Sequence, residues 1–431
     1  MTALEPPAGG TSGAAPEKVG FRVIVADPAV RVVVLIIFVI MLGFGIIAPI
    51  LPLFARSFGV GYDTASLLIS AFAFARLIVD PIAGPIVDRY GERFASMAGV
   101  VIVGVSAFLA GIAPNFALAV LFRGAGGAGS SILFAALYSY LLKVVPSSRM
   151  ARTMSVFFGA LNVGIIAGGP IGGIIADRFD LNTPLFVYSG LCFAAGVLYL
   201  RFMKDPQPKA GTSPEPNADI QSEGSQWRRT GAVVQGLLRT PAFVTAIFLN
   251  MTFFWVVAGG YDTLVPLFGR EALGMSTVAI GAVFAVAVVA EFLVLYPAGS
   301  VADRVGRKPV MLVSLTGLAI MIAVVGWAKT PMALAVLMGL LGLTSGSAAA
   351  TPSAMLSDVV EDQASGTAVG VFRFAGDLGF VLGPLVGGIA ADALGFRWAF
   401  AFMSAPVLLA LVLVARTPET LRKPEGASKG A

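Results

Sequence analysis

The sequence contains no histidine and a single cysteine, Cys192, which lies in an apolar context. Without a second cysteine no disulfide can form within the chain, and a zinc site or a histidine-based catalytic triad lacks its usual ligands and base. Charged residues are also scarce, at 12% of the chain, against about 25% in an average soluble protein. These absences argue against metal-dependent or hydrolytic chemistry and against a soluble fold.

Long apolar runs are what the chain has instead, and 57% of its residues are hydrophobic. The runs from Val32 to Phe54 and from Pro309 to Ala328 are each long enough for a helix that crosses the ~30 Å hydrocarbon core of a bilayer. They are continuous and do not alternate polar with apolar residues, so helices are expected and membrane strands are not. We therefore predict an all-α integral membrane protein.

Twelve spans result when the chain is divided at its charged, proline-rich and glycine-rich points. The expected spans lie at about 30–55, 64–87, 94–113, 116–145, 153–177, 184–203, 241–268, 277–302, 309–328, 331–357, 366–392 and 397–416. The first six form an N-terminal bundle at 30–203 and the last six a C-terminal bundle at 241–416. Each bundle thus contains six transmembrane helices.

Three polar segments flank these bundles. The proline-rich stretch 204–240 cannot bury a core and is predicted to be a cytoplasmic linker. Residues 1–29 have no basic start followed by an apolar core, so we expect a disordered N-terminal tail and no cleavable signal. Residues 417–431 are predicted to be a cytoplasmic tail.

The basic residues indicate the orientation. If the N-terminus is inside, 21 of the 29 Lys and Arg fall in inner segments and three in spans. The five outer ones are Arg56, Arg178, Arg270, Lys329 and Arg397. Since short loops rich in basic residues stay in the cytoplasm, both termini are expected inside a plasma (inner) membrane. The sequence pI of about 9.4 then follows from topology, and no nucleic-acid partner is expected.

The two halves are repeats of one another. The segment that begins at Gly84 recurs 215 positions later at Gly299, with Asp88 and Arg89 matched by Asp303 and Arg304. Two similar bundles joined by a long linker are typical of transporters whose site lies between the halves, near the bilayer midplane.

These loop segments resemble a motif of the major facilitator superfamily, in its twelve-span drug:proton antiporter branch. The second copy matches at Gly299, Asp303, Arg304, Gly306, Arg307 and Lys308, and the first at Gly84, Asp88, Arg89, Gly91 and Arg93. The first copy departs from the motif at Glu92, where the family usually has a basic residue. The resemblance implies that Asp88, Arg89, Asp303 and Arg304 lock an inner gate.

Two further segments support the resemblance. Span 4 carries the arginine of a family motif in "LFRGAGGAGSS", with Arg123, Gly127 and Gly129 in place. Span 11 fits the glycine and proline spacing of the antiporter motif, at Gly370, Gly379, Gly383, Pro384, Gly387 and Gly388. In the family that motif normally lies in span 5, where this chain has a version with one extra residue, "GIIAGGPIGG" at 164–173. Small residues and proline let a helix approach its neighbours closely and flex, so Gly379, Gly383 and Pro384 are gating candidates.

Four ionisable residues lie in spans 2 and 11, which the resemblance places opposite each other. A charge at mid-bilayer costs from ~2.5 to over 10 kcal/mol, so these residues should be paired, hydrated or protonated. Span 2 runs inward and span 11 outward, which predicts contacts between Arg76 and Asp377 and between Asp80 and Arg373. Alternatively, each helix pairs its own ions four residues apart and merely neutralises them.

Glu291 and Arg123 are candidates for proton coupling, together with Asp80 and Asp377. Glu291 precedes Gly299 by eight residues, as Arg76 precedes Gly84, and it has no basic neighbour within a turn. A lone carboxyl in hydrocarbon suits a proton carrier, whose change of charge alters the affinity for substrate. Alternatively, it is a permanently protonated, hydrogen-bonded acid. Arg123 either couples proton to substrate or is a structural arginine.

Span 7 is predicted to contribute to the substrate site. Aromatic residues suit lipophilic cations, although such stripes more often face lipid or other helices. The candidates are Asn250, Phe253, Phe254, Trp255 and Tyr261, with Asp262 near the outer end of the span and Asn162 in span 5.

The leading functional hypothesis is a secondary antiporter, neither an enzyme nor an ATP-driven pump, since no phosphate-binding loop is present. It would export amphiphilic small molecules against protons by alternating access, without a cofactor or metal, as a monomer in the lipid bilayer. One alternative is a proton symporter or lipid flippase of the same fold, and another is a transport-inactive sensor or assembly subunit. The ions kept within the spans argue against the last, because a protein that does not transport has little reason to keep them.

Overall fold

The computed structural model describes residues 27–203, 231, 233–349, 351–360 and 365–421. Most of the expected linker and tails lies outside these residues. The described chain is helical throughout, with no strand, and it contains twelve helices long and apolar enough to cross a membrane. Their number and order agree with the sequence-based expectation, and most ends lie within a few residues of it. The protein is a multi-pass membrane protein.

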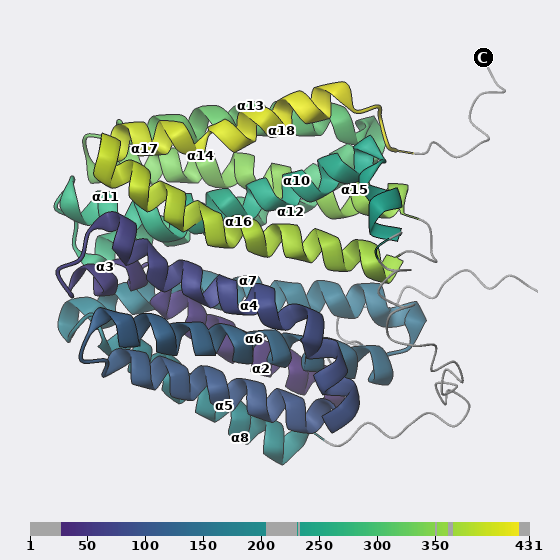
Figure 1. The fold of residues 1–431 in the computed structure, drawn as a ribbon, viewed down its shortest axis with the longest axis horizontal. Coiled ribbons are helices and arrows are strands. Elements are labelled where there is room, and N and C mark those ends of the chain that lie inside the picture. Colours follow the sequence, from purple (N-terminus) through teal and green to yellow (C-terminus); the bar gives the residue numbers. More distant parts are fainter. Residues whose placement is uncertain (1–26, 204–230, 232, 350, 361–364, 422–431) are drawn as a thin grey trace, which may run out of the picture.

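Six spans form the first bundle, the lower half of the molecule in Figure 1. Its helices are α2 (Pro28–Ile47), α3 (Leu51–Arg56), α4 (Tyr62–Tyr90), α5 (Glu92–Gly111), α6 (Phe116–Val144), α7 (Ser147–Arg178) and α8 (Thr183–Phe202). Its apolar core joins α2 to the helices around it through fully buried residues such as Ile37, Leu133 and Tyr188.

The second bundle lies above the first in Figure 1 and contains the other six spans. Its elements are α10 (Pro241–Trp255), η1 (Val256–Leu264), α11 (Val265–Glu271), α12 (Thr277–Val305), α13 (Arg307–Val325), α14 (Pro331–Ala349), α15 (Pro352–Val359), α16 (Ser365–Leu394), α17 (Phe396–Met403) and α18 (Ala405–Arg416). The element η1 is a π-helix of nine residues in the middle of span 7, a winding that is rare and often found at functional sites.

The spans run back and forth between two faces of the molecule. We call the face that holds the start of α2 and the end of α18 the terminal face, and the opposite one, with the connections 57–61, 179–182 and 272–276, the distal face. At the terminal face, α4 turns into α5 at Gly91 and α12 turns into α13 at Gly306, with φ of 80° and 118°. Residues with a side chain rarely adopt such angles, which explains why both repeated loop segments have glycine at this point.

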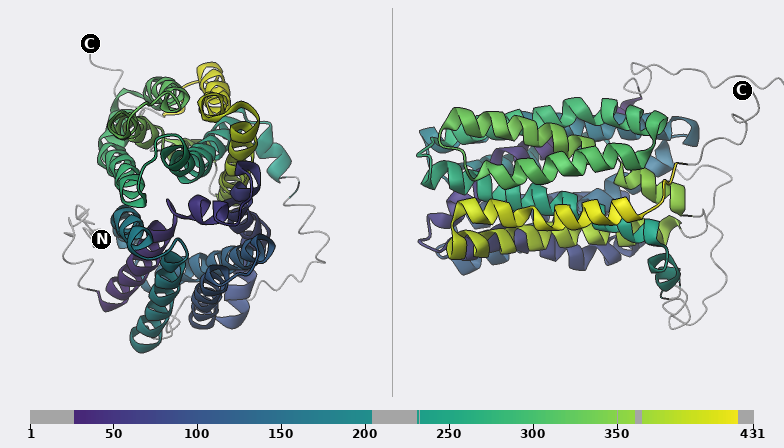
Figure 2. Two further views of the ribbon diagram at one scale, coloured as in Figure 1. Left: turned by 90° about the vertical axis from the view of Figure 1, so that its left-hand side faces the viewer. Right: turned by 90° about the horizontal axis from the view of Figure 1, so that it is seen from above.

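The two bundles meet along a seam formed by two helix pairs. Helix α4 packs on α16, and α7 packs on α12, while Figure 2 shows the two groups of helices seen from the distal face. The α7–α12 contact is close because Gly169 lies against the backbone of Gly281. Side chains on these four helices are therefore placed to link or separate the halves, as are those where α3 meets α11.

Candidate functional site

Two ion pairs cross the seam between α4 and α16. The Arg76 guanidinium lies 3.2 Å from Asp377, and that of Arg373 lies 3.3 Å from Asp80. The hydroxyl of Ser131, on α6, donates a hydrogen bond to Asp80. Asp377 is the most deeply buried of the four ions, with 9% of its side chain exposed. The two predicted contacts between spans 2 and 11 are present, and their role in transport stays a prediction.

The four ions form one cluster rather than two separate pairs. Within α4, Arg76 also acts on the charge of Asp80, and the carboxyl of Asp377 lies beside that of Asp80. Among the described residues, the ion pairs of these four side chains join the two bundles, and none joins Arg76 to Asp80 or Arg373 to Asp377 as the alternative hypothesis expected. A proton on either acid would weaken a link between the halves.

A second polar group lies at the centre of the seam. A cavity of about 10 Å³ is lined by Arg123 of α6, Asp262 of η1 and apolar residues that include Phe44, Phe72 and Phe380. The Arg123 guanidinium lies 4.0 Å from the centre of the Phe72 ring, and its Nε and Nη1 have no hydrogen-bond partner among the described residues. Buried donors without partners are rare, and a role of Arg123 in coupling proton to substrate stays a prediction.

Glu291 points into the second bundle. Its carboxylate accepts a hydrogen bond from Ser345 of α14 at 3.2 Å, and its charge acts on Tyr261 and Asp262 of η1. No arginine or lysine among the described residues forms an ion pair with it. An acid without a cationic partner agrees with the expected environment of a proton carrier, and that role stays a prediction.

Asp262, expected near the outer end of span 7, lies in the π-helix of that span. It is buried within η1, with 6% of its surface exposed, and it lines the central cavity opposite the first bundle. Asp262 therefore connects the neighbourhood of Glu291 to the seam.

The other substrate candidates are mostly engaged in packing. Asn250 donates to the carbonyl of Phe372 at 2.8 Å, and the indole of Trp255 donates to that of Met403 at 3.2 Å. Asn162 donates to the carbonyl of Phe158 in its own helix. Phe254 reaches the seam, with its ring centre 6.2 Å from that of Phe380. Phe254 thus contacts a residue that lines the central cavity, and substrate binding by the predicted aromatic wall stays a prediction.

The motif residues at the terminal face lie where the loops turn. Asp88, Arg89, Asp303 and Arg304 are exposed. Asp303 lies 3.7 Å from Arg307, whose Nε is 2.5 Å from Asp358. Their gating role stays a prediction.

In the first half, Glu92 takes the place of Arg307. Glu92 pairs with Lys143 and accepts a hydrogen bond from Ser139 at 2.8 Å. The departure of this copy from the family motif is therefore accompanied by a basic partner on α6.

Two of the gating glycines pack within the second bundle and not across the seam. A side chain on Gly379 would collide with the carbonyl of Met251, and a Cβ on Gly383 would lie 2.6 Å from that of Trp255, both on α10. Pro384 follows inside α16. These residues bring α10 and α16 together, so a direct contact with the first bundle is not their contribution here.

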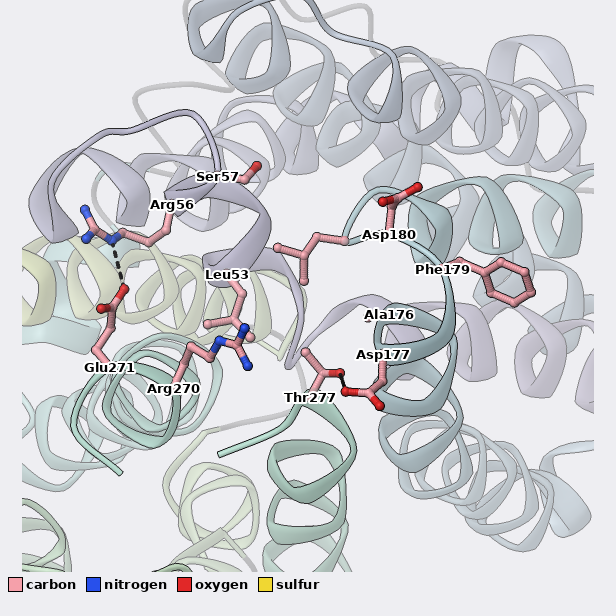
Figure 3. Close-up of a pocket in the computed structure, with 11 residues that line it drawn as sticks. Leu53, Arg56, Ser57, Ala176, Asp177, Phe179, Asp180, Arg270, Glu271 and Thr277 are labelled. Carbon is pink, nitrogen blue, oxygen red and sulfur yellow. Dashed lines mark hydrogen bonds and ion pairs between the residues drawn. The ribbon is translucent and has the colours of Figure 1, made fainter. Parts of the chain in front are cut away.

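A larger cavity, which the sequence did not suggest, opens at the distal face (Figure 3). It has a volume of about 410 Å³, and its walls carry Arg56, Asp177, Asp180, Arg270 and Glu271. The guanidinium of Arg56 pairs with Glu271 across the seam at 3.5 Å. Charged residues at span ends are common, so their presence alone does not predict a cavity. The only signal in the sequence was that such residues occur at the distal ends of spans in both halves.

The sequence profile of the Major Facilitator Superfamily matches residues 33–295 and 270–431. Multidrug resistance protein 2 of Bacillus subtilis (strain 168) is 25% identical over 388 residues, which cover 88% of this chain and 92% of that protein. Quinolone resistance protein NorA of Staphylococcus aureus (strain Mu50 / ATCC 700699) is 23% identical over 240 residues. That alignment spans 56% of this chain and 58% of the relative.

Solved transporters share the fold at low sequence identity. A bacterial homologue of the human lysosomal transporter Spinster, in an inward-facing and occupied conformation, aligns with a TM-score of 0.74 at 13% identity, over 90% of this chain and 95% of that one. The nucleoside transporter NupG, as its D323A mutant, gives 0.72 at 13% identity, over 90% and 99%. These likenesses concern the arrangement of the helices.

Proposed function

Because the chain belongs to the Major Facilitator Superfamily, we propose that it is a proton-coupled antiporter that exports amphiphilic small molecules by alternating access. The names of its relatives, a multidrug and a quinolone resistance protein, support this cargo class. In this proposal the terminal face and both termini are cytoplasmic, and the monomer works in the plasma membrane without a cofactor or enzymatic activity.

The observation that carries the proposal is the pair of ion contacts across the seam, Arg76 with Asp377 and Asp80 with Arg373. Ions left alone in hydrocarbon are costly, so the bundles can part here only if water or another charge replaces each partner. A proton or a cationic substrate provides such a replacement. Movement of the two bundles therefore depends on whether a proton or a cationic substrate is bound in the seam.

Glu291 is the proposed proton carrier, and Asp262 is the proposed link to the substrate. A proton that binds Glu291 changes the charge next to Asp262, which faces Arg123 across the central cavity. The cavity of about 10 Å³ holds one water molecule at most. A substrate among Phe44, Phe72 and Phe380 therefore requires another conformation, in which the cavity is wider.

Transport by purified protein in liposomes tests this function. A lipophilic fluorescent cation such as ethidium, supplied on the side of the terminal face, should cross the membrane in the direction opposite to protons that flow down an imposed gradient. Its binding to detergent-solubilised protein should release protons. Flux in the same direction as protons would indicate the symporter. Movement of labelled lipid alone would indicate the flippase. Ethidium binding without any flux, in the wild-type protein that keeps its ionisable residues in the spans, would indicate the sensor.

A further inference from the structure

A short segment is repeated at the distal ends of α7 and α16. It reads "GGIIAD" at 172–177 and "GGIAAD" at 387–392, and the two copies are 215 positions apart. This is the offset that also relates the loop segments of the terminal face. In each copy the second glycine and the aspartate are four residues apart, so both lie on one face of the helix.

The second glycine of each copy touches the other bundle. A Cβ on Gly388 would lie 2.6 Å from the carbonyl oxygen of Tyr62, at the start of α4. A Cβ on Gly173 would collide with the carbonyl of Thr277, at the start of α12. Tyr62 and Thr277 are themselves 215 residues apart. The two seam contacts are therefore equivalent under the repeat, each joining the end of one helix to the beginning of another.

The aspartate of each copy then binds the first turn of the helix that its glycine touches. Asp392 accepts a hydrogen bond from the backbone N–H of Asp63 at 2.8 Å. Asp177 accepts one from the hydroxyl of Thr277 at 3.3 Å, and the same hydroxyl lies 2.9 Å from the carbonyl of Gly173. Figure 3 shows the Asp177 side chain directed at Thr277. A carboxylate at a helix N-terminus is favoured by the helix dipole as well.

We propose that Asp177 and Asp392 are two equivalent latches that hold the distal face closed, a role that rests on the proposed alternating access. Helix α7 cannot part from α12, nor α16 from α4, without losing these hydrogen bonds. Both aspartates are exposed, so water can take over their hydrogen bonds when the face opens. A hydrogen bond that water can replace favours the closed state only modestly, so the distal face can still open.

The α16 latch lies within a wider closed contact of the distal face. The ring of Tyr62 lies 5.0 Å from that of Phe396, centre to centre. The guanidinium of Arg56, which pairs with Glu271 at the border of the large cavity, lies 4.6 Å from the centre of the same Tyr62 ring. These contacts between the bundles remain when the Asp392 latch alone is lost.

Pulsed electron spin resonance distances between spin labels test the latches in the full chain. Cys192 is fully buried, and replacing it with alanine gives a background for engineered cysteines. Pro114→Cys with Lys329→Cys reports on the distal face, and Tyr90→Cys with Val305→Cys reports on the terminal face. Each pair is exposed and related by the 215-residue offset.

The variants to compare are Asp177→Ala, Asp392→Ala and their combination. We expect the ratio of distal-open to distal-closed molecules to rise about fivefold for each latch, the size of effect that one hydrogen bond supplies. Asp180→Ala is the matched control, because this acid lines the same cavity without joining a latch. Asp392→Asn keeps an acceptor and should give a smaller rise. Thr277→Val removes the hydroxyl that donates to Asp177 and to the carbonyl of Gly173.

An unchanged distal distance distribution in folded Asp177→Ala and Asp392→Ala, or the same shift in Asp180→Ala, would overturn the latch assignment. The terminal pair separates this outcome from failure of the proposed function. If neither pair in the wild type responds to ethidium or to acidification, alternating access fails, while a latch that holds the distal face closed still gives a longer distal distance in its alanine variants.

Discussion

Arg307 on α13 and Asp358 on α15 form an ion pair whose nearest atoms lie 2.5 Å apart. The residues 215 positions earlier, Glu92 and Lys143, form the equivalent pair with the charges exchanged. Each pair ties the start of the third span of its bundle to the end of the fourth. The repeat has thus kept the interaction while inverting its polarity in one half.

Exchanging the charges of the first pair should therefore be tolerated. Glu92→Arg leaves Lys143 opposite a like charge, and Lys143→Asp leaves two acids together, so we expect each single variant to lose about 1–2 kcal/mol of stability. The double variant, which has the polarity of the second half, should recover most of the loss. Thermal unfolding in detergent measures all three, and a double variant as unstable as the singles would contradict the prediction.

The crossing ion pair of Asp80 and Arg373 should be exchangeable in the same way. Asp80→Arg and Arg373→Asp each place like charges together in the seam, and both should abolish ethidium transport in liposomes. The combined variant should restore transport if the pair matters as a link between the bundles. Binding measured in detergent serves as the control for folding, and the absence of rescue in a folded double variant would argue against this link.

Glu291→Gln should separate binding from proton coupling. The amide can still accept the hydrogen bond from Ser345, but it cannot carry a proton. We expect ethidium binding to persist, whereas transport driven by a proton gradient is lost and binding no longer releases protons. Ser345→Ala, which leaves the acid in place, is the matched control and should retain coupled transport. Unchanged proton-driven transport in Glu291→Gln would remove this acid from the mechanism.

Two glycines of α16 should respond differently to the same substitution. A side chain at Gly379 collides with α10, whereas a Cβ at Gly370 meets nothing within 4 Å. Gly379→Val should cost about 1–3 kcal/mol or more through overpacking, and Gly370→Val only the small difference in helix propensity. Because both variants introduce valine, the difference between their thermal unfolding temperatures reports the effect of packing. Equal losses would show that α10 and α16 yield to the added bulk.

Glu419 gives a pH-dependent prediction outside the spans. Partial burial acts to raise the pKa of its carboxyl, but hydrogen bonds from the backbone N–H groups of Leu421, Lys308, Arg307 and Thr420 outweigh it and hold the pKa below its usual range. The ionised form therefore stabilises the folded state above the unfolded pKa of about 4.3, and this contribution is lost as pH falls from there through the lowered pKa. Glu419→Gln should unfold at a lower temperature than the wild type at neutral pH, and the difference should vanish in acid. A difference that does not depend on pH would contradict this prediction.

The sequence predicted much of the architecture because its signals are strong and local. Span number follows from uninterrupted apolar runs, and the turns at Gly91 and Gly306 follow from backbone angles that other residues avoid. The pairing of Arg76 with Asp377 followed from opposite helix directions, the cost of lone ions and the family resemblance, which places spans 2 and 11 opposite each other. Within that arrangement, counting residues supplies the depth in the membrane that decides which ions meet.

The sequence could not predict toward which neighbour each side chain points around the axis of its helix. Glu291 and Arg76 are equivalent under the repeat, yet Arg76 faces the seam while Glu291 faces Ser345 within its own bundle. In span 7 the π-helix breaks the 3.6-residue count, so Asp262 could not be aligned with Phe254 from spacing. Long-range packing decides these orientations.

The narrow centre of the seam also bears on what the protein does when it is idle. A constriction that is ringed by Phe44, Phe72 and Phe380 and leaves about 10 Å³ cannot hold the chain of water that an ion needs to pass through. Protons and metal ions would therefore meet a barrier at this point of the seam. A cell could then keep many copies of this protein in its membrane without dissipating the gradient that would drive the proposed antiport.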